Sequence, residues 1–200
     1  MVWYVIDGMD GSGKTTVSDL IREQLESESR RVLQITHPNR NSIFGRISSR
    51  FLHIDSGVSV LIAPAFYILD VFRSLRILRN SKREYDDIIF VRYLMAVGYL
   101  PEKICDIAYR VLERVLPMPD IRIFVDLDAE TSMKRITERG EDLEIFESAE
   151  KLDRTRNRML RLTDGWIIID NSKTESFTEL QIRDIVDSSL ALNKSSTSRE

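Results

Sequence analysis

The 200-residue sequence is poor in cysteine and histidine, with one cysteine, Cys105, and two histidines, His37 and His53. A single cysteine excludes an internal disulfide framework and a metal site built from several cysteines. Two histidines are too few for a histidine-rich zinc site. The sequence is therefore neither a disulfide-stabilised scaffold nor a typical zinc protein.

A surplus of positive charge is also missing, because 29 lysine and arginine residues face 32 acidic residues and leave a net charge of −3. A general nucleic-acid binder needs an excess of cations to neutralise phosphates, so we expect no nucleic-acid partner. The longest apolar stretch, 58–72, is interrupted by polar residues and by Pro64. It is shorter than the roughly 20 apolar residues of a membrane-spanning helix, and the N-terminus lacks the basic start of a signal peptide. We expect no membrane partner and a cytoplasmic location.

The composition and length are typical of one folded domain. With 42% hydrophobic and 30% charged residues, the chain has enough apolar surface to form a core and does not resemble a disordered protein. We predict a single domain over 1–192 and a disordered tail over 193–200, where polar residues predominate.

Short apolar runs alternate with amphipathic segments along the chain. This alternation is the pattern of a parallel sheet with helices on both faces. Strands are predicted at 3–7, 31–36, 87–91, 121–126 and 166–170. Helices are predicted at 15–27, 43–51, 60–78, 101–115, 129–137, 149–162 and 178–190. The predicted fold class is therefore α/β, a three-layer sandwich around a five-stranded parallel sheet.

The turn after the first predicted strand matches the phosphate-loop pattern G-x-x-x-x-G-K-[ST] at every fixed position. It reads Gly8-Met9-Asp10-Gly11-Ser12-Gly13-Lys14-Thr15, and Thr16 follows it. Glycines allow the backbone to wrap a phosphate with its N–H groups pointing inward, at the positive end of the next helix. Lys14 can neutralise the β- and γ-phosphates of ATP, and the Thr15 hydroxyl can bind Mg²⁺. The motif predicts a fold of the P-loop NTPase type in which residues 8–16 bind ATP, with Mg²⁺ held by Thr15.

Several motifs go beyond the general pattern and resemble the thymidylate kinase family. The phosphate loop with Asp7 before it and Asp10 inside it is the most specific of them, and the resemblance covers about residues 2–190. The other parts are Arg92-Tyr93, Pro119-Asp120 with the strand to Asp128, the arginines of 134–139 and 154–158, and the strand 166–170. The resemblance implies a kinase that moves the γ-phosphate of ATP to a nucleoside monophosphate, with dTMP as the expected acceptor. It also implies a homodimer by analogy.

The resemblance further implies roles for single residues on the acceptor side. Asp10 would contact the sugar of the monophosphate, and Arg92 would hold its phosphate. Tyr99 would match a tyrosine of the family's substrate site. Tyr67 and Asp70 belong to the segment that matches the family's base-stacking helix, although an aromatic residue on an apolar helix is equally often part of the core.

Two further arginines are predicted to act on the transferred phosphate. Arg135 and Arg139 lie four residues apart, so they share one face of a helix. Phosphoryl transfer spreads negative charge over the moving group, and movable arginines stabilise that charge. We expect both arginines, with Lys14 and Arg92, to be the catalytic cations, and 135–150 to form a short lid. A solvated charged helix is the alternative interpretation of this segment.

The sequence departs from the family on the acceptor side. The family's Asp-Arg pair is Val91-Arg92 here, which removes a carboxylate expected near Mg²⁺ and the reacting phosphates. The second predicted strand ends in Thr36-His37-Pro38 without the usual arginine, and Val71 stands where the base-stacking helix normally has one. Two alternatives therefore remain open: a non-catalytic nucleotide-binding protein derived from the family, and a kinase for a different monophosphate.

Overall fold

The structure is a computed structural model that describes residues 1–39, 42–43, 46–47, 59–138 and 148–197. The strands are β1 (Val2–Asp7), β2 (Val32–Thr36), β3 (Asp87–Val91), β4 (Ile121–Asp126) and β5 (Ile167–Asp170). The α-helices are α1 (Lys14–Ser27), α3 (Ser59–Asn80), α4 (Glu102–Val115), α5 (Ala129–Glu138), α6 (Ala149–Leu160) and α7 (Glu175–Thr197). Two short 3₁₀-helices, η1 (Ser81–Arg83) and η2 (Met95–Tyr99), flank β3.

The strands form one parallel sheet in the order β2-β3-β1-β4-β5. Strand β1 is central, and its Ile6 pairs with Val91 of β3 and with Ile123 of β4. Every residue of β1 is buried, because a central parallel strand is covered on both faces; all of its residues except the last, Asp7, form a near-continuous hydrophobic run. The predicted five-stranded parallel α/β fold is confirmed.

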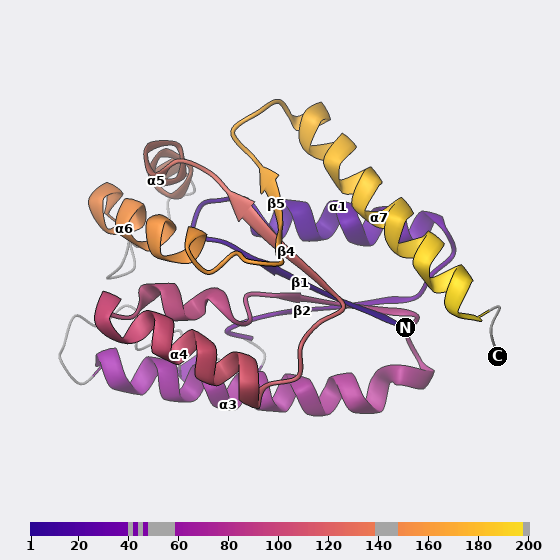
Figure 1. The fold of residues 1–200 in the computed structure, drawn as a ribbon, viewed down its shortest axis with the longest axis horizontal. Helices are drawn as coiled ribbons and strands as arrows, with labels where there is room; N and C mark the ends of the chain where they lie inside the picture. Colours follow the sequence, from indigo (N-terminus) through magenta and orange to yellow (C-terminus); the bar gives the residue numbers. More distant parts are fainter. Residues whose placement is uncertain (40–41, 44–45, 48–58, 139–147, 198–200) are drawn as a thin grey trace.

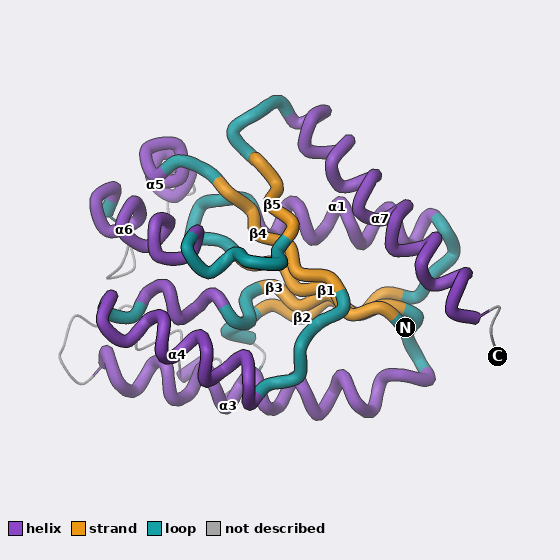
Figure 2. The backbone as a smooth tube through the Cα atoms, in the orientation of Figure 1, coloured by secondary structure: helices purple, strands orange, loops and turns teal. Residues whose placement is uncertain are grey.

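Alternate side chains of β1 enter two separate apolar clusters, as the period of two of a strand requires. Trp3 and Val5 face the layer that contains α3 and α4, whereas Tyr4 and Ile6 face the layer of α1 and α7. Figure 1 shows α1 and α7 side by side on one face of the sheet and α3 with α4 on the other. The tube view in Figure 2 shows the strands between these two helical layers, as in the predicted three-layer sandwich.

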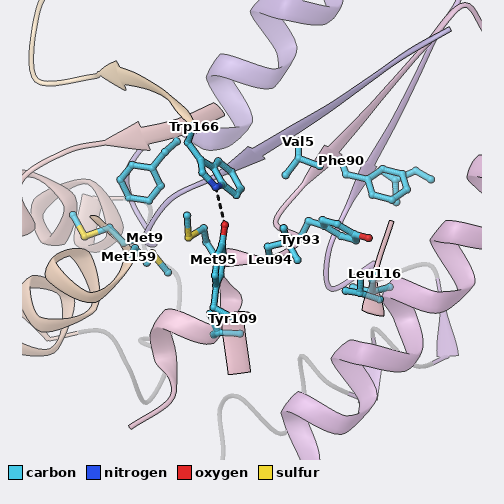
Figure 3. Close-up of a cluster of buried hydrophobic side chains, with 14 of the residues drawn as sticks. Val5, Met9, Phe90, Tyr93, Leu94, Met95, Tyr109, Leu116, Met159 and Trp166 are labelled. Atoms are coloured by element: carbon cyan, nitrogen blue, oxygen red, sulfur yellow. Dashed lines mark hydrogen bonds between the residues drawn. The ribbon is translucent and has the colours of Figure 1, made fainter. Parts of the chain in front are cut away.

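The larger cluster combines aromatic contacts with a hydrogen bond between Trp166 and Tyr109 (Figure 3). The ring of Trp3 lies edge-on to Phe90 and Tyr93, with centroids 5.3 Å and 5.2 Å away. Trp166 precedes β5, and its indole Nε1–H donates to the hydroxyl of Tyr109 on α4 at 2.9 Å. The indole of Trp166 can therefore be buried without leaving its N–H group unpaired.

Most predicted elements agree with the structure to within a few residues. Helix α7 is longer than predicted, since it begins at Glu175 and continues to Thr197. No glycine or proline follows the predicted end at residue 190, so nothing in the sequence ends the helix there. The expected polar tail from residue 193 therefore starts as helix. Most of the predicted helix 43–51, His53 and residues 139–147 of the lid lie outside the described residues.

Within the described ranges, no helix combines the length and apolar character needed to cross a membrane.

Candidate active site

The phosphate loop connects the carboxyl end of β1 to the first residue of α1, Lys14. Gly11 and Gly13 have φ angles of 77° and 96°, in the left-handed region where glycine is the residue that fits without strain. A Cβ on Gly11 would lie 2.6 Å from the carbonyl oxygen of Ser132, and one on Gly13 would overlap the amide of Asn171. The loop is thus fixed by backbone conformation and by close neighbours from α5 and from the end of β5.

Asn171 connects the phosphate loop to the end of β5, the edge strand of the sheet. Its amide Nδ2 donates to the Ser12 carbonyl at 2.7 Å, and its Oδ1 accepts from the Thr178 hydroxyl at 3.2 Å. Its backbone N–H donates to the Asp126 carbonyl at 2.9 Å. Our sequence reasoning missed this residue. Its position directly after a parallel strand was the available signal, because ligand sites of open α/β sheets lie at the carboxyl ends of the strands.

Lys14, the first residue of α1, is buried next to the phosphate loop. Its Nζ donates to the Met9 carbonyl at 2.6 Å and lies 3.6 Å from Oδ1 of Asp10. Burial, together with the nearby charge of Arg92, lowers the pKa of Lys14 to about 8. The ammonium therefore remains predominantly charged at neutral pH.

Asp10 is the centre of the charged cluster. Its carboxylate forms an ion pair with Arg92 and accepts from the Tyr99 hydroxyl at 2.5 Å. The same hydroxyl accepts the backbone N–H of Asp10 at 2.9 Å. Burial alone would raise the pKa of Asp10, but the cations Arg92 and Lys14 outweigh it and hold the pKa well below its usual range. The carboxylate is therefore ionised throughout the physiological pH range.

Arg92 follows β3 with φ at 64°, in the left-handed region that a non-glycine residue rarely adopts. Its N–H donates to the Ile6 carbonyl at 2.9 Å, and its carbonyl lies 2.8 Å from Nδ1 of His37. Such a conformation persists where the surroundings hold it, and it is frequent at functional sites. The backbone turn at Arg92 directs the guanidinium toward Asp10.

The buried carboxylate of Asp7 fixes the chain after Arg92. Its Oδ2 accepts the backbone N–H groups of Tyr93, Leu94 and Met95 at 3.0, 3.1 and 3.2 Å. Burial raises the pKa of Asp7 even though these bonds favour the ionised form. Asp7 thus organises the backbone between β3 and η2.

A cavity of about 530 Å³ opens beside the phosphate loop. Lys14, Arg92 and Arg135 of α5, three of the predicted catalytic cations, all line this cavity. Thr15 and Thr16 are exposed at its wall. The remaining lining residues are Gly11, Gly13, Leu20, Glu138, Asn171, Lys173, Glu175 and Thr178. Arg139 lies outside the described residues, so its expected role stays a prediction.

The structure brings four of the predicted residues into direct contact, namely Asp10, Lys14, Arg92 and Tyr99. Tyr67 and Asp70 have other partners. The Tyr67 hydroxyl donates to the Tyr93 carbonyl at 3.3 Å. The buried Asp70 carboxylate accepts the Asn39 N–H at 2.6 Å and the hydroxyl of Ser42. The substrate-binding roles of Tyr67 and Asp70 therefore stay predictions. In the structure Tyr67 contacts the segment after β3, and Asp70 contacts the segment after β2.

Val91 stands where the family has a carboxylate, and its side chain packs among apolar residues. It is fully buried and belongs to the apolar cluster that contains Val17 and Ile21 of α1. We expected its side chain near the reacting phosphates, and its apolar surroundings contradict that expectation. The alternation of β3 explains the difference, because Val91 shares the sheet face of Ile89, which packs beneath α1 and α7.

Comparison with known proteins identifies the family of this fold and site. A family model described as thymidylate kinase matches residues 6–182. The chain belongs to the thymidylate kinase family. The resemblance drawn from the sequence motifs is thereby confirmed, and the chain is an enzyme of the nucleoside-monophosphate kinase class.

Members of the thymidylate kinase family from distant organisms match most of the chain. A probable thymidylate kinase of Archaeoglobus fulgidus is 24% identical over 96% of this chain and 97% of its own length. The probable thymidylate kinase of Methanocaldococcus jannaschii is 25% identical over 86% of this chain and 88% of its own length. The thymidylate kinase of Leptospira borgpetersenii is 24% identical over 80% of this chain and 80% of its own length.

A solved structure of thymidylate kinase from Candida albicans has the same fold. It superposes with a TM-score of 0.77 over 94% of this chain and 92% of that one, at 19% identity. The P-loop kinase fold predicted from the sequence is therefore confirmed independently of the family model.

Proposed function

We propose that this protein transfers the γ-phosphate of MgATP to dTMP, giving ADP and dTDP. The observation that carries the proposal is one connected cluster in which Asp10 contacts Lys14 on the donor side and Arg92 on the acceptor side. The cluster lies at the carboxyl edge of a parallel sheet, where such folds bind ligands, in a chain of the thymidylate kinase family.

The donor would bind at the phosphate loop, residues 8–16. The backbone N–H groups of the loop and the positive end of α1 favour the β- and γ-phosphates. Lys14 now donates to the Met9 carbonyl, and in the complex its ammonium would bind a phosphate oxygen instead. A charge-assisted bond of this kind is stronger than one to a neutral carbonyl.

The residues at the loop fit the magnesium ion that the family implies. The described residues contain no cluster of three or more histidine, cysteine or acidic side chains that could hold a metal. Mg²⁺ commonly binds through substrate phosphates and water with few protein ligands, and the exposed Thr15 hydroxyl at the cavity wall offers one such ligand. When bound with ATP, the ion would neutralise charge on the β- and γ-oxygens.

The acceptor would be held by the other half of the cluster. The guanidinium of Arg92 suits a phosphate because it presents its donors in a fork. Asp10, oriented by Tyr99, would accept from a sugar hydroxyl of dTMP. With the two substrates anchored on either side of Asp10, the acceptor phosphate is positioned for attack on the γ-phosphate.

Charge in the transition state would be stabilised by cations already at the cavity. Lys14, Arg92 and Arg135 all line it, and Arg139 is the further arginine predicted for the lid. Fixed cations lower the barrier where negative charge develops. The protein supplies positioning and electrostatics, which are the main contributions to phosphoryl transfer.

A kinase for a different monophosphate is the second candidate function. One observation favours it: Val71, which replaces the family's base-binding arginine, is buried in the core at 2% exposure. A buried valine offers no hydrogen bond to a base, so the preference for thymine would depend on other groups.

The test is direct analysis of the products formed from MgATP and dTMP. We expect ADP and dTDP to form in equal amounts with the parent protein. Lys14→Ala should lower kcat/KM for ATP by about 100-fold or more, because the buried cation at the phosphates is lost. ATP hydrolysis without dTDP would exclude the proposed transfer.

A further inference from the structure

Arg92 depends on its neighbours for a backbone conformation that arginine rarely adopts. Its φ angle is 64°, and a side chain with a Cβ is disfavoured in this left-handed region. A small rotation of the backbone at this residue would swing the long side chain away from Asp10. The groups that hold the Arg92 backbone therefore also hold its guanidinium.

His37 contacts Arg92 from the end of the neighbouring strand, β2. Its Nδ1 lies 2.8 Å from the Arg92 carbonyl oxygen, and its backbone N–H donates to the Val91 carbonyl at 2.9 Å. In return, the Arg92 guanidinium lies 3.4 Å from the His37 carbonyl. A carbonyl oxygen has no proton, so the hydrogen in the first contact must be on Nδ1.

The surroundings of the ring favour its neutral form. His37 is fully buried, and its Nε2 has no hydrogen-bond partner among the residues that the structure describes. The ring lies edge-on to Phe90 and Tyr67, with centroids 5.2 Å and 6.2 Å away. A charged imidazolium here would bury an unpaired N–H beside the positive charge of Arg92, which is costly.

We propose that His37 is a positioning residue of the acceptor site. As the neutral Nδ1–H tautomer, it donates to the Arg92 carbonyl and keeps Arg92 in the conformation from which the guanidinium reaches the acceptor phosphate. The inference rests on the proposed function of Arg92. It concerns a side chain to which the sequence analysis assigned no role in the site.

Lys14, on the donor side, contacts groups of the phosphate loop itself, whereas His37 contacts Arg92 from the end of β2. The Nζ of Lys14 donates to the Met9 carbonyl at 2.6 Å and lies 3.6 Å from Oδ1 of Asp10. Asn171 holds the same loop from β5. Loss of the imidazole should therefore weaken binding of the acceptor and leave binding of ATP intact.

Two substitutions with one control test this separation by steady-state kinetics. His37→Leu removes the donor, and it should raise the KM for dTMP about tenfold and leave the KM for ATP within about twofold, since a small displacement of a positioning group has large effects. His37→Asn retains an N–H near the place of Nδ1 and should restore most of the dTMP affinity. Leu75→Ala, in the core cluster that contains Phe90, controls for lost stability and should change neither KM.

The result for His37→Leu decides the kinetic part of the proposal. An unchanged KM for dTMP, an equal rise in both KM values, or a failure of His37→Asn to restore affinity would overturn the positioning role. Thermal melts of all three variants identify any change that follows from unfolding alone.

A second measurement does not depend on turnover. Long-range proton–nitrogen NMR of the histidines, assigned with His53→Gln, should find His37 protonated on Nδ1 and bare on Nε2 from about pH 6 to about pH 8. The opposite tautomer would overturn the proposal. If the parent protein failed to phosphorylate dTMP, the proposed function would fall, and the tautomer would still decide whether His37 holds Arg92.

Discussion

The guanidinium of Arg92 and the carboxylate of Asp10 form an ion pair although 82 positions separate them in the chain. The pair joins the end of β3, where we place the acceptor, to the phosphate loop, where we place the donor. Lys14 approaches the same carboxylate. Asp10 therefore neutralises part of the charge of two cations that, in the proposed complex, would bind the phosphates of the substrates. The site is thus electrostatically paired before either nucleotide binds.

Asp10→Ala should raise the KM for dTMP by about tenfold or more and affect the KM for ATP much less. The substitution removes the proposed contact to the acceptor sugar and leaves Arg92 without its partner. Asp10→Asn, which can still accept from Tyr99, is the matched control for the shape of the loop. Initial rates with each nucleotide varied in turn provide the measurement, and equal effects on both KM values would point to a general defect of the loop.

Asn171→Ala should loosen the phosphate loop. It removes the bond to the Ser12 carbonyl and leaves that acceptor unpaired, at a cost of about 1–3 kcal/mol if the group stays buried. We expect a lower melting temperature and a several-fold higher KM for ATP. Asn157→Ala, an exposed asparagine on α6, is the control and should leave both unchanged. A parent-like KM for ATP in Asn171→Ala would show that this tether is dispensable.

The stability of the protein should fall in acid because of His37. Burial lowers the pKa of His37 from its ordinary value of 6.5, with Asp70 opposing this shift and the charge of Arg92 adding to it. An unfolded chain binds the proton more readily, so the contribution of neutral His37 is complete above about pH 6.5 and is lost as the pH falls below that value.

Denaturant unfolding between about pH 7 and about pH 5 measures this effect. The loss assigned to His37 has an upper limit of about 1.4 kcal/mol per pH unit. His37→Asn carries no titrating group, so its unfolding free energy should fall less steeply over the same range. Tyr67, which also faces the ring, does not titrate in this interval. Parallel curves for the two proteins would contradict a neutral, buried His37.

Val91→Asp, which restores the residue typical of the family, should destabilise the fold. The side chain lies in an apolar cluster with Val17 and Ile21, so an aspartate there would be buried without a partner or would take up a proton. We expect a loss of a few kcal/mol in unfolding free energy and no gain in kcat. Val91→Ala controls for the lost volume. A folded Val91→Asp protein with a higher kcat would show that the position reaches the phosphates after all.

The strands and most helices could be predicted from the sequence because their signals are local. A buried parallel strand such as β1 is a short continuous apolar run, and the phosphate loop has its spacing within eight residues. The positions of Asp10, Lys14 and Arg92 at one edge of the sheet followed from the rule that parallel strands end together. These parts need no knowledge of long-range packing.

Other parts of the site could not be predicted because they depend on contacts between distant segments. Asn171 lies 159 positions from the carbonyl that it binds, and His37 lies 55 positions from Arg92. Asp70 was matched to the family's base-stacking helix, and the hydrogen bond that its carboxylate accepts from Asn39, 31 positions away, was not predicted. Motif matching identifies residue types, and the tertiary packing decides which partners their side chains meet.

The most direct test of the account is the initial rate of diphosphate formation from MgATP with a panel of nucleoside monophosphates. The panel contains dTMP, dUMP, dCMP, dGMP, UMP, CMP and AMP at equal concentrations. We predict that dTMP gives the highest kcat/KM and that Arg92→Ala lowers this value both by raising the KM for the acceptor and by lowering kcat, because the cation is lost from the acceptor phosphate and from the transition state. Turnover that is highest with another monophosphate would contradict the assignment of dTMP, and no diphosphate from any member of the panel would contradict the account as a whole.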